Sequence, residues 1–535
     1  MMLFPLRISV LALLLASPLA VVAQPAPQPS TEAQQKGPRP ERGPEAREGR
    51  RLPPDVTSEH ELQLPGRTLK FTATAGSLPL VDPAGNVQAE IGYVAYRLAG
   101  AEPGSRPVTF ALNGGPGAAS AYLHLGPLGP WRLPVGAASV SPSQPPTLVP
   151  NAETWLDFTD LVFIDPIDTG YSRANGSPDE IRDRYFTIDG DVASLSAVIA
   201  RWLRANDRLG SPKFYIGESY GGFRGPLIAH KLQTEIGIGL SGLVLLSPVL
   251  DFGLLSQPRH APMDFVTRLP SYAAARLELK GTVSRDALAD VERYAAGEYL
   301  TDLTRGLQDR EAVSRVSTRV AELTGLDPDL VRRRAGRVDA GTFTREFRRQ
   351  DSRVVSLYDT GVSSPDPDPT ASTREGDDPG LTALTAPLTS AIVHHLWENL
   401  GWRVPNQRYE LLNGSVNGRW RFGRGRSSPQ VVDDLKQAIA LDPKLRVMVV
   451  HGLTDLVTPY FANELILRQL PPDTGARVSL ATYPGGHMFY TRDGSRAAFR
   501  ADAERMYGEA LRARAGDEAG ASAPRPELDR PAADR

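Results

Sequence analysis

The sequence predicts an α/β fold with a mostly parallel central sheet, because compact β-prone runs alternate with helical patterns or long loops. Apolar residues fill most positions of these runs, as expected for strands that are buried on both faces. The runs are Val108 to Leu112, Leu161 to Ile164, Lys213 to Ile216, Leu243 to Leu246 and Arg446 to Val450.

The segments around these runs suggest how the domain is divided. Short apolar alternations between Glu61 and Leu98 predict antiparallel strands that open the domain. A helix is expected before the third run, because its apolar residues from Val192 to Leu203 share one face. Helix starts replace β-prone runs from Phe252 to about Pro387, which predicts an inserted helical lid. The predicted parts are 58–252 and 388–513 for the sheet domain and 253–387 for the lid.

The two ends of the chain have compositions unlike the rest. Residues 1–23 contain Arg7, an apolar run and small residues up to Ala23, the order of a secretory signal peptide. A membrane anchor is the alternative, but the apolar run is shorter than the roughly 20 residues that span a bilayer. We therefore expect a secreted or periplasmic protein without stable membrane insertion after cleavage. Residues 24–57 and 514–535 have little to bury and are predicted to be disordered.

The charge balance and the absence of cysteine exclude several classes of function. Lys and Arg total 60 against 62 Asp and Glu, so there is no basic excess to suggest nucleic acid as a partner. The 535 residues include no cysteine, which excludes disulfides, a thiol nucleophile and thiolate metal ligands. No metal or organic cofactor is implied, and the sequence predicts no particular oligomeric state.

A nucleophile-elbow pattern follows the third β-prone run. Gly217-Glu218-Ser219-Tyr220-Gly221 matches Gly-x-Ser-x-Gly between a strand and a helical stretch. The flanking glycines allow a sharp turn that exposes the serine hydroxyl above the strand end. An ordinary strand-to-helix turn is the alternative, but the strand–turn–helix context favours an α/β-hydrolase fold with Ser219 as the nucleophile.

A serine nucleophile requires a base and an acid that orients the base. Asp455 follows the last β-prone run and His487 lies on a glycine-rich loop, so Ser219, Asp455 and His487 occur in the order used by this fold. His451 at a strand end is the rival base. Asp251, which also follows a strand, is the rival acid.

A glycine-rich loop follows the first β-prone run, where this fold places an oxyanion-hole amide. The segment Asn113-Gly-Gly-Pro-Gly117 lets a backbone N–H approach a developing oxyanion, with the N–H of Tyr220 as the second donor. A plain Gly-Pro turn is the alternative reading.

Five segments together resemble, in order, the signature segments of the serine carboxypeptidases. They are Asn113 to Gly117, Ile164 to Ser172, Gly217 to Gly222, the turn at Asp455, and Gly486-His487-Met488. The resemblance implies hydrolysis of the C-terminal residue of peptides or proteins through an acyl-enzyme. It further implies that Asn113 and Glu218 bind the substrate's free carboxylate and that Gly115 and Tyr220 form the oxyanion hole.

The chain also departs from the family's pattern at three positions. Ala111 replaces a tryptophan, Ala118 replaces a cysteine, and His124 stands where a second acidic residue is usual. If His124 lies near Glu218 and is protonated, it would add a positive charge there. The alternative functions are an esterase, an acyltransferase or an aminopeptidase on the same fold, or a non-catalytic binding protein.

Overall fold

The central sheet contains the predicted strands. The computed structural model describes residues 51–102, 104–135, 142–143, 147–255, 258–281, 283–373, 376–423 and 427–521. In the ten-stranded sheet β8 (Arg173–Ala174) pairs with β3, and the other strands follow the spatial order β1 (Val56–Leu64), β2 (Arg67–Val81), β3 (Val87–Leu98), β7 (Asp160–Ile164), β4 (Val108–Leu112), β9 (Lys213–Glu218), β10 (Gly242–Leu246), β13 (Arg446–Gly452) and β14 (Val478–Tyr483).

The strand directions divide the sheet into two regions. Strands β1, β2, β3 and β7 pair antiparallel, whereas every neighbouring pair from β7 to β14 is parallel. Every residue of β4, β7 and β10 is buried, as expected for parallel strands that are covered on both faces. The predicted α/β class with a mostly parallel sheet is confirmed.

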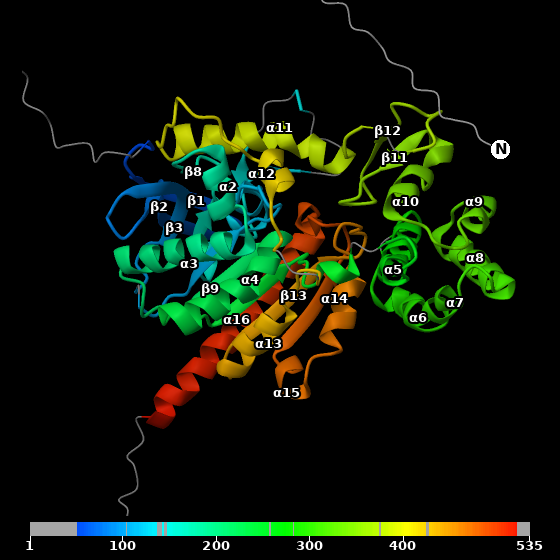
Figure 1. Ribbon diagram of the computed structural model, residues 1–535. Helices are drawn as coiled ribbons and strands as arrows, with labels where there is room; N and C mark the ends of the chain where they lie inside the picture. Colours follow the sequence, from blue (N-terminus) through cyan, green and yellow to red (C-terminus); the bar gives the residue numbers. More distant parts are fainter. Residues whose placement is uncertain are drawn as a thin grey trace, which may run out of the picture. The chain divides into compact units, whose positions relative to one another are not determined.

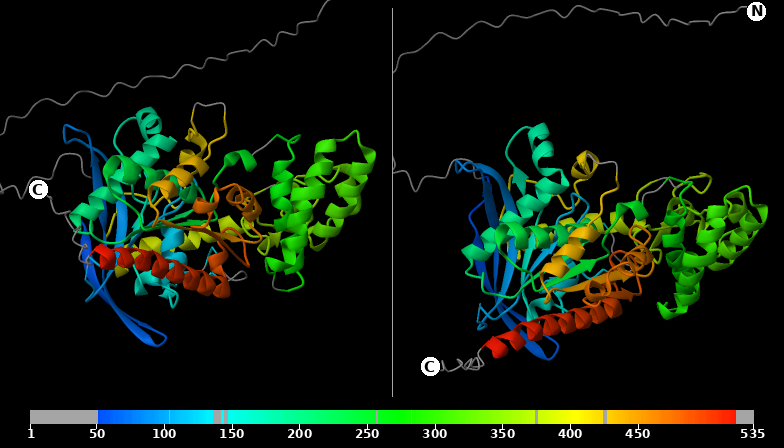
Figure 2. Two further views of the ribbon diagram at one scale, coloured as in Figure 1. Left: turned by 90° about the horizontal axis from the view of Figure 1, so that it is seen from below. Right: turned by 60° about the horizontal axis from the view of Figure 1, so that its bottom comes forward.

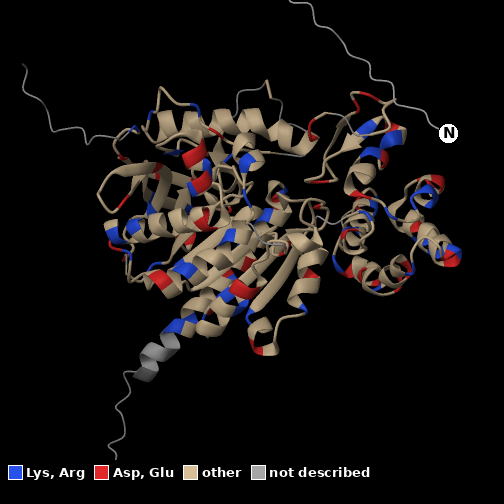
Figure 3. Cartoon of the chain, in the orientation of Figure 1, with Lys and Arg blue, Asp and Glu red and all other residues tan. Residues whose placement is uncertain are grey.

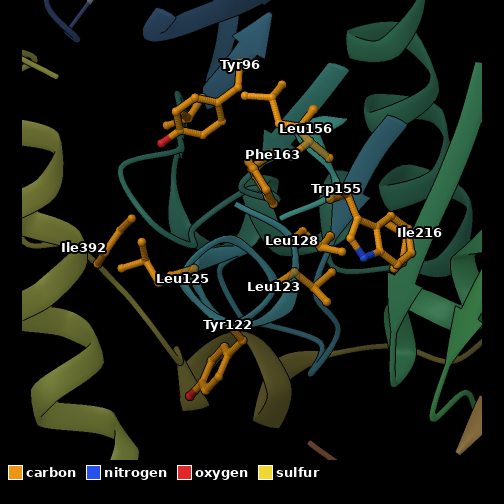
Figure 4. Close-up of a cluster of buried hydrophobic side chains, with 14 of the residues drawn as sticks. Tyr96, Tyr122, Leu123, Leu125, Leu128, Trp155, Leu156, Phe163, Ile216 and Ile392 are labelled. Atoms are coloured by element: carbon orange, nitrogen blue, oxygen red, sulfur yellow. The ribbon is translucent and has the colours of Figure 1, made fainter. Parts of the chain in front are cut away.

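Helices cover both faces of the sheet. One hydrophobic core lies under α3 (Ile188–Ala205), α4 (Tyr220–Lys231) and α13 (Val432–Leu441). The other lies under α11 (Pro379–His394) and α16 (Asp493–Ala521). Figure 2 shows α16, in red, on the opposite side of the sheet from α3 and α4. Figure 4 shows part of this second core, where Tyr96, Phe163 and Trp155 gather around the segment that follows β4.

Helix α3 illustrates how the sequence sets these elements. The side chain of its N-cap residue Thr187 accepts a hydrogen bond from the N–H of Gly190, which satisfies one free donor of the first turn. The predicted apolar face between Val192 and Leu203 is buried against the sheet. The helix ends at Ala205, and β9, the strand that leads to Ser219, begins at Lys213.

The segment between β10 and β13 contributes no strand to the main sheet within its described residues. We call residues 263–346 the helical cluster, which Figure 1 shows in green beside α14. Its core includes residues of α14 (Tyr460–Leu467) together with Leu453 and Leu456, which flank Asp455. The cluster consists of α5 (Met263–Glu278), α6 (Ala289–Tyr294), α7 (Leu300–Arg305), α8 (Arg310–Thr324), α9 (Pro328–Arg333) and α10 (Ala340–Glu346).

Shorter elements complete the described chain. They are α1 (Ala121–Leu123), η1 (His124–Leu128), β5 (Trp131–Arg132), β6 (Val149–Pro150), η2 (Trp155–Asp157), α2 (Pro178–Tyr185), η3 (Leu232–Ile236), η4 (Phe252–Leu254), η5 (Asp286–Leu288), η6 (Ala295–Tyr299), η7 (Arg349–Asp351), β11 (Arg353–Val355), β12 (Ser363–Pro365), η8 (His395–Asn399), α12 (Gly414–Arg419), α15 (Pro472–Gly475) and η9 (Phe489–Thr491). Strands β11 and β12 form a small antiparallel pair between the helical cluster and α11. This pair places residues 356–362 in a turn that reaches the loop of His487, as described below.

Two of the predicted boundaries differ from the structure. Leu52 is buried, and its N–H donates to Glu90 at 3.1 Å, so the predicted disorder of residues 24–57 does not hold at this residue. Helix α16 continues to Ala521, past position 514. The signal peptide predicted for residues 1–23 lies outside the described residues.

Figure 3 marks the positions of charged residues along the chain. In the view of Figure 3 both signs are interspersed over the sheet domain and the helical cluster, and α11 has no charged residue before its final histidine. Among the described residues, no helix is both long and apolar enough to cross a membrane.

Candidate active site

Ser219 lies at the sharp turn between β9 and α4. Its backbone has φ 60° and ψ −120°, a conformation that non-glycine residues rarely adopt outside functional turns. The Ser219 N–H donates to the carbonyl of Leu246 at 2.9 Å, which fixes the turn to the end of β10. Ser219 is partly exposed while Glu218 and Tyr220 are buried, so the turn presents the serine to solvent.

The glycine-rich loop after β4 contacts this turn through its backbone. A Cβ on Gly114 would lie 2.5 Å from the Tyr220 nitrogen, and a Cβ on Gly221 would lie 2.5 Å from the Leu112 oxygen. Only glycine allows the two backbones to approach so closely. Neither Gly115 N–H nor Tyr220 N–H donates to an acceptor in the described part of the chain. Both donors are therefore available to a ligand beside Ser219.

Asp455 and His487 form a buried hydrogen-bonded pair. The Nδ1 of His487 lies 2.8 Å from Oδ2 of Asp455. The other oxygen, Oδ1, accepts the N–H groups of Val457 at 2.8 Å and Thr458 at 3.0 Å. Because the carboxylate is fixed from both sides, it holds Nδ1 in the protonated form and leaves Nε2 as the basic nitrogen.

Two further contacts hold the loop of His487. Its N–H donates to the Tyr358 carbonyl at 2.5 Å, and its carbonyl accepts the Ser247 hydroxyl at 2.9 Å. The Tyr358 ring meets the imidazole edge-on at a centroid distance of 5.5 Å. Among the described residues, neither the Ser219 hydroxyl nor Nε2 of His487 hydrogen-bonds another side chain. No hydrogen bond joins Ser219 to His487 among the described residues.

The surroundings of His487 favour its protonated form. Burial by itself would lower the pKa of His487, but the carboxylates of Asp455 and Glu218 outweigh burial and raise this pKa above its usual value. An imidazolium formed during a reaction would be stabilised by the same two groups.

Glu218 is a buried acid next to Ser219. Its Oε2 accepts the hydroxyl of Tyr490 at 2.9 Å, and the side chain of Asn113 forms a second hydrogen bond with it. Burial raises the pKa of Glu218 to about 7, although the charge of His487 and both hydrogen bonds oppose the change. Near neutral pH this side chain can therefore act as a hydrogen-bond donor.

The rival base and the rival acid are held elsewhere. His451 is fully buried, its Nε2 lies 2.8 Å from Nδ2 of Asn463, and burial lowers its pKa to about 4. Asp251 accepts the N–H of Gly253 at 2.7 Å and caps the short helix η4. Neither side chain makes a hydrogen bond to His487.

His124 lies in a buried cluster with Tyr96 and His395. Its Nε2 is 2.7 Å from the hydroxyl of Tyr96, which also lies 2.8 Å from Nε2 of His395. Burial and the neighbouring His395 lower the pKa of His124 well below its usual value. The condition of a protonated His124 is therefore not met, because burial among Tyr96, His395 and Phe163 disfavours the charged ring.

Four residues at the site were not identified from the sequence. Tyr490 contacts Glu218, Tyr358 and Ser247 hold the His487 loop, and Thr458 contacts both Asp455 and His487. For Thr458 and Tyr490, the only indication in the sequence is their position three residues after Asp455 and His487, respectively. No group of three or more potential metal ligands occurs in the part of the chain that the structure describes.

The sheet order, the turn at Ser219 and the position of the Asp–His pair after β13 and β14 define an α/β-hydrolase fold. Kex1(Δ)p, a prohormone-processing carboxypeptidase from Saccharomyces cerevisiae, has the same fold in its crystal structure. The TM-score is 0.52 at 14% identity, and the match covers 82% of this chain and 92% of that one.

Sequence comparison finds similarity to one family of α/β-hydrolases. The serine carboxypeptidase family profile matches residues 69–259. Pheromone-processing carboxypeptidase KEX1 of Yarrowia lipolytica is 29% identical over 370 residues, which cover 68% of this chain and 52% of the relative. Serine carboxypeptidase-like 42 of Arabidopsis thaliana is 31% identical over 249 residues, covering 44% and 47%. The chain is thus similar to the serine carboxypeptidases over residues 69–259 and spans about half the length of these two relatives.

Proposed function

We propose that the chain is a serine carboxypeptidase that hydrolyses the C-terminal residue of peptides or proteins. In this proposal Ser219 is the nucleophile, His487 the general base and acid, and Asp455 the residue that orients the imidazole. The N–H groups of Gly115 and Tyr220 stabilise the oxyanion. The family relationship and the buried hydrogen bond between Asp455 and His487 support these roles.

The reaction is expected to proceed in two steps. Nε2 of His487 takes the Ser219 proton as Oγ bonds to the carbonyl carbon, and the imidazolium then protonates the departing amine of the C-terminal residue. Water next attacks the acyl-enzyme, giving its proton to His487, which returns it to Oγ as the shortened peptide leaves. Each proton taken up by the imidazole is thus returned, and the sum is hydrolysis of one peptide bond.

The observation that favours a carboxypeptidase over other hydrolases is the buried acid Glu218, which precedes Ser219 and whose pKa is raised by burial. A substrate carboxylate can be bound by Glu218 only if one of the two acids keeps its proton, because two adjacent negative charges repel. Burial supplies this condition by raising the pKa of Glu218 to about 7. Asn113, which hydrogen-bonds Glu218, would provide a second donor to the same carboxylate.

The test compares peptides that differ only at the C-terminus. Between pH 4 and 8 we expect kcat/KM for removal of the last residue to be orders of magnitude higher for a free-acid peptide than for its amide. Ser219→Ala and His487→Ala should each abolish turnover of both peptides while circular dichroism shows a folded protein. Equal rates for acid and amide would refute the carboxypeptidase proposal and favour an esterase or endopeptidase.

Two further expectations from the sequence belong to this proposal. Export directed by residues 1–23 is supported by their charge, apolar core and small-residue order. The reading of 253–387 as a lid is supported by Tyr358, which comes from this segment and contacts His487 through its carbonyl and its ring.

A further inference from the structure

Thr458 contacts both members of the buried Asp–His pair, although the mechanism above assigns it no role. It lies three residues after Asp455, before α14, and is fully buried. Its Oγ1 is 2.6 Å from Oδ2 of Asp455 and 3.1 Å from Nδ1 of His487. The same Oδ2 accepts the imidazole at 2.8 Å, so one carboxylate oxygen receives both groups.

The hydroxyl of Thr458 has one proton and three neighbouring polar atoms. Nδ1 of His487 carries its own proton towards Asp455, so it cannot accept another. The remaining acceptors are Oδ2 of Asp455 at 2.6 Å and the carbonyl of Ser247 at 3.0 Å. The carboxylate is both nearer and charged, and charged acceptors form the shorter and stronger hydrogen bonds. The Thr458 hydroxyl therefore donates its hydrogen bond to Oδ2 of Asp455.

We propose that Thr458 is a positioning residue that donates its hydroxyl to Oδ2 of Asp455 and thereby sets the orientation and basicity of His487. This inference rests on the proposed function, because it assumes that His487 is the catalytic base. The carboxylate of Asp455 already accepts two backbone N–H groups on Oδ1 and the imidazole on Oδ2. The Thr458 hydroxyl is a further donor to Oδ2. Both carboxylate oxygens of Asp455 are thus fixed by hydrogen bonds, and the carboxylate fixes the orientation of the His487 imidazole.

The hydroxyl also withdraws negative charge from the oxygen that faces the imidazole. The ionisable groups near His487 are Asp455 after β13, Glu218 at the end of β9, His451 in β13, and Tyr358, which lies between β11 and β12. The two carboxylates favour the imidazolium, and Thr458 weakens the contribution of Asp455. Removing the hydroxyl should thus raise the pKa of His487 while loosening its orientation.

A purely structural role makes a different prediction. If the hydroxyl mainly bonded the Ser247 carbonyl, it would tie the loop to the end of β10, and its loss would reduce stability without changing the titration of His487. Thr454 provides a matched control in the same loop. Its buried hydroxyl donates to the carboxylate of Asp359 at 3.0 Å and has no hydrogen bond to the Asp–His pair.

The experiment compares Thr458→Val, Thr458→Ser and Thr454→Val in the full-length chain. We expect Thr458→Val to lower kcat for a free-acid peptide by about tenfold, the effect of losing one hydrogen bond to a charged group, with KM within about twofold. The acidic limb of its kcat profile should move to higher pH. Thr458→Ser should restore both properties, and Thr454→Val should leave the limb in place.

A second measurement does not depend on turnover. NMR titration of histidine-labelled protein, with His487→Ala used for assignment, should show His487 titrating at higher pH in Thr458→Val than in the wild type. If Thr458→Val does not fold, Thr458→Ala removes the hydroxyl without placing a methyl group against the carboxylate. An unchanged His487 titration in the folded variant, or failure of serine to restore it, would overturn the positioning role. Absence of peptidase activity in the wild type would instead refute the proposed function, whatever the titration shows.

Discussion

The proposed carboxylate site predicts that substrate binding weakens as Glu218 loses its proton. Burial raises the pKa of this side chain to about 7, whereas the substrate's own carboxyl group is ionised throughout the neutral range. The protonated fraction of Glu218 would then fall from about nine-tenths at pH 6 to about one-tenth at pH 8. KM for a free-acid peptide should therefore rise about tenfold between these two pH values.

Replacing Glu218 with glutamine separates the hydrogen bond from the titration. The amide keeps a donor for the substrate carboxylate and an acceptor for the Tyr490 hydroxyl, but it has no proton to lose. KM for the free-acid peptide should become nearly independent of pH between 6 and 8. The assay is steady-state hydrolysis of a blocked dipeptide and its amide at half-unit pH intervals, with kcat and KM fitted separately.

Glu292 offers a matched control in the helical cluster. It is buried and accepts the Tyr460 hydroxyl at 2.9 Å, as Glu218 accepts that of Tyr490. Glu292→Gln should leave the pH dependence of KM unchanged. A flat KM in the wild-type enzyme, or the same tenfold rise in Glu218→Gln, would show that Glu218 does not bind the carboxylate in its protonated form.

Two other predictions concern the acid of the pair and the buried histidines. Asp455→Asn should lower kcat by orders of magnitude because the imidazole loses its orientation, whereas Asp251→Asn should change it little; the reverse ranking in the same peptide assay would make Asp251 the orienting acid. Burial lowers the folded-state pKa of His124 and brings that of His395 to about 3, so below pH 6.5 the unfolded chain binds protons that the folded protein excludes. The stability that depends on these two histidines should therefore be present above pH 6.5 and fall by up to about 4 kcal/mol at pH 5. Urea unfolding at both pH values measures this loss, and a pH-independent midpoint would contradict it.

The sequence was most informative where a segment is buried on both faces. Strands such as β4 and β10 could be predicted because every residue faces a core, so their apolar runs are continuous. Strand β14 gave no such signal. It is the last strand in the sheet order, and only Tyr483 of its six residues is buried. A half-exposed edge strand needs few apolar residues, so its sequence resembles that of a loop.

The site shows the same limit. The Asp455–His487 hydrogen bond could be predicted because the fold fixes the order of these residues and the strands that precede them. The contact from Tyr490 to Glu218 could not, because it joins positions 272 residues apart and matches no local pattern. The partners of His124 were missed for the same reason. Its neutral state follows from packing against Tyr96 and His395, which no spacing in the sequence reveals.

Glu218 and His487 influence each other's protonation because each lies within electrostatic reach of the other. The negative charge of Glu218 raises the pKa of His487, and the positive charge of His487 opposes the burial that raises the pKa of Glu218. One proton shared by this pair can therefore rest on the acid or on the imidazole, and the observed titrations belong to the pair. In the proposed mechanism, only the state with a neutral imidazole and a protonated acid can accept the Ser219 proton and bind a carboxylate. A bound substrate carboxylate favours this state, because its charge holds the proton on Glu218. Substrate binding in the proposed enzyme would thus select the active protonation state of the catalytic base as well as position the peptide bond.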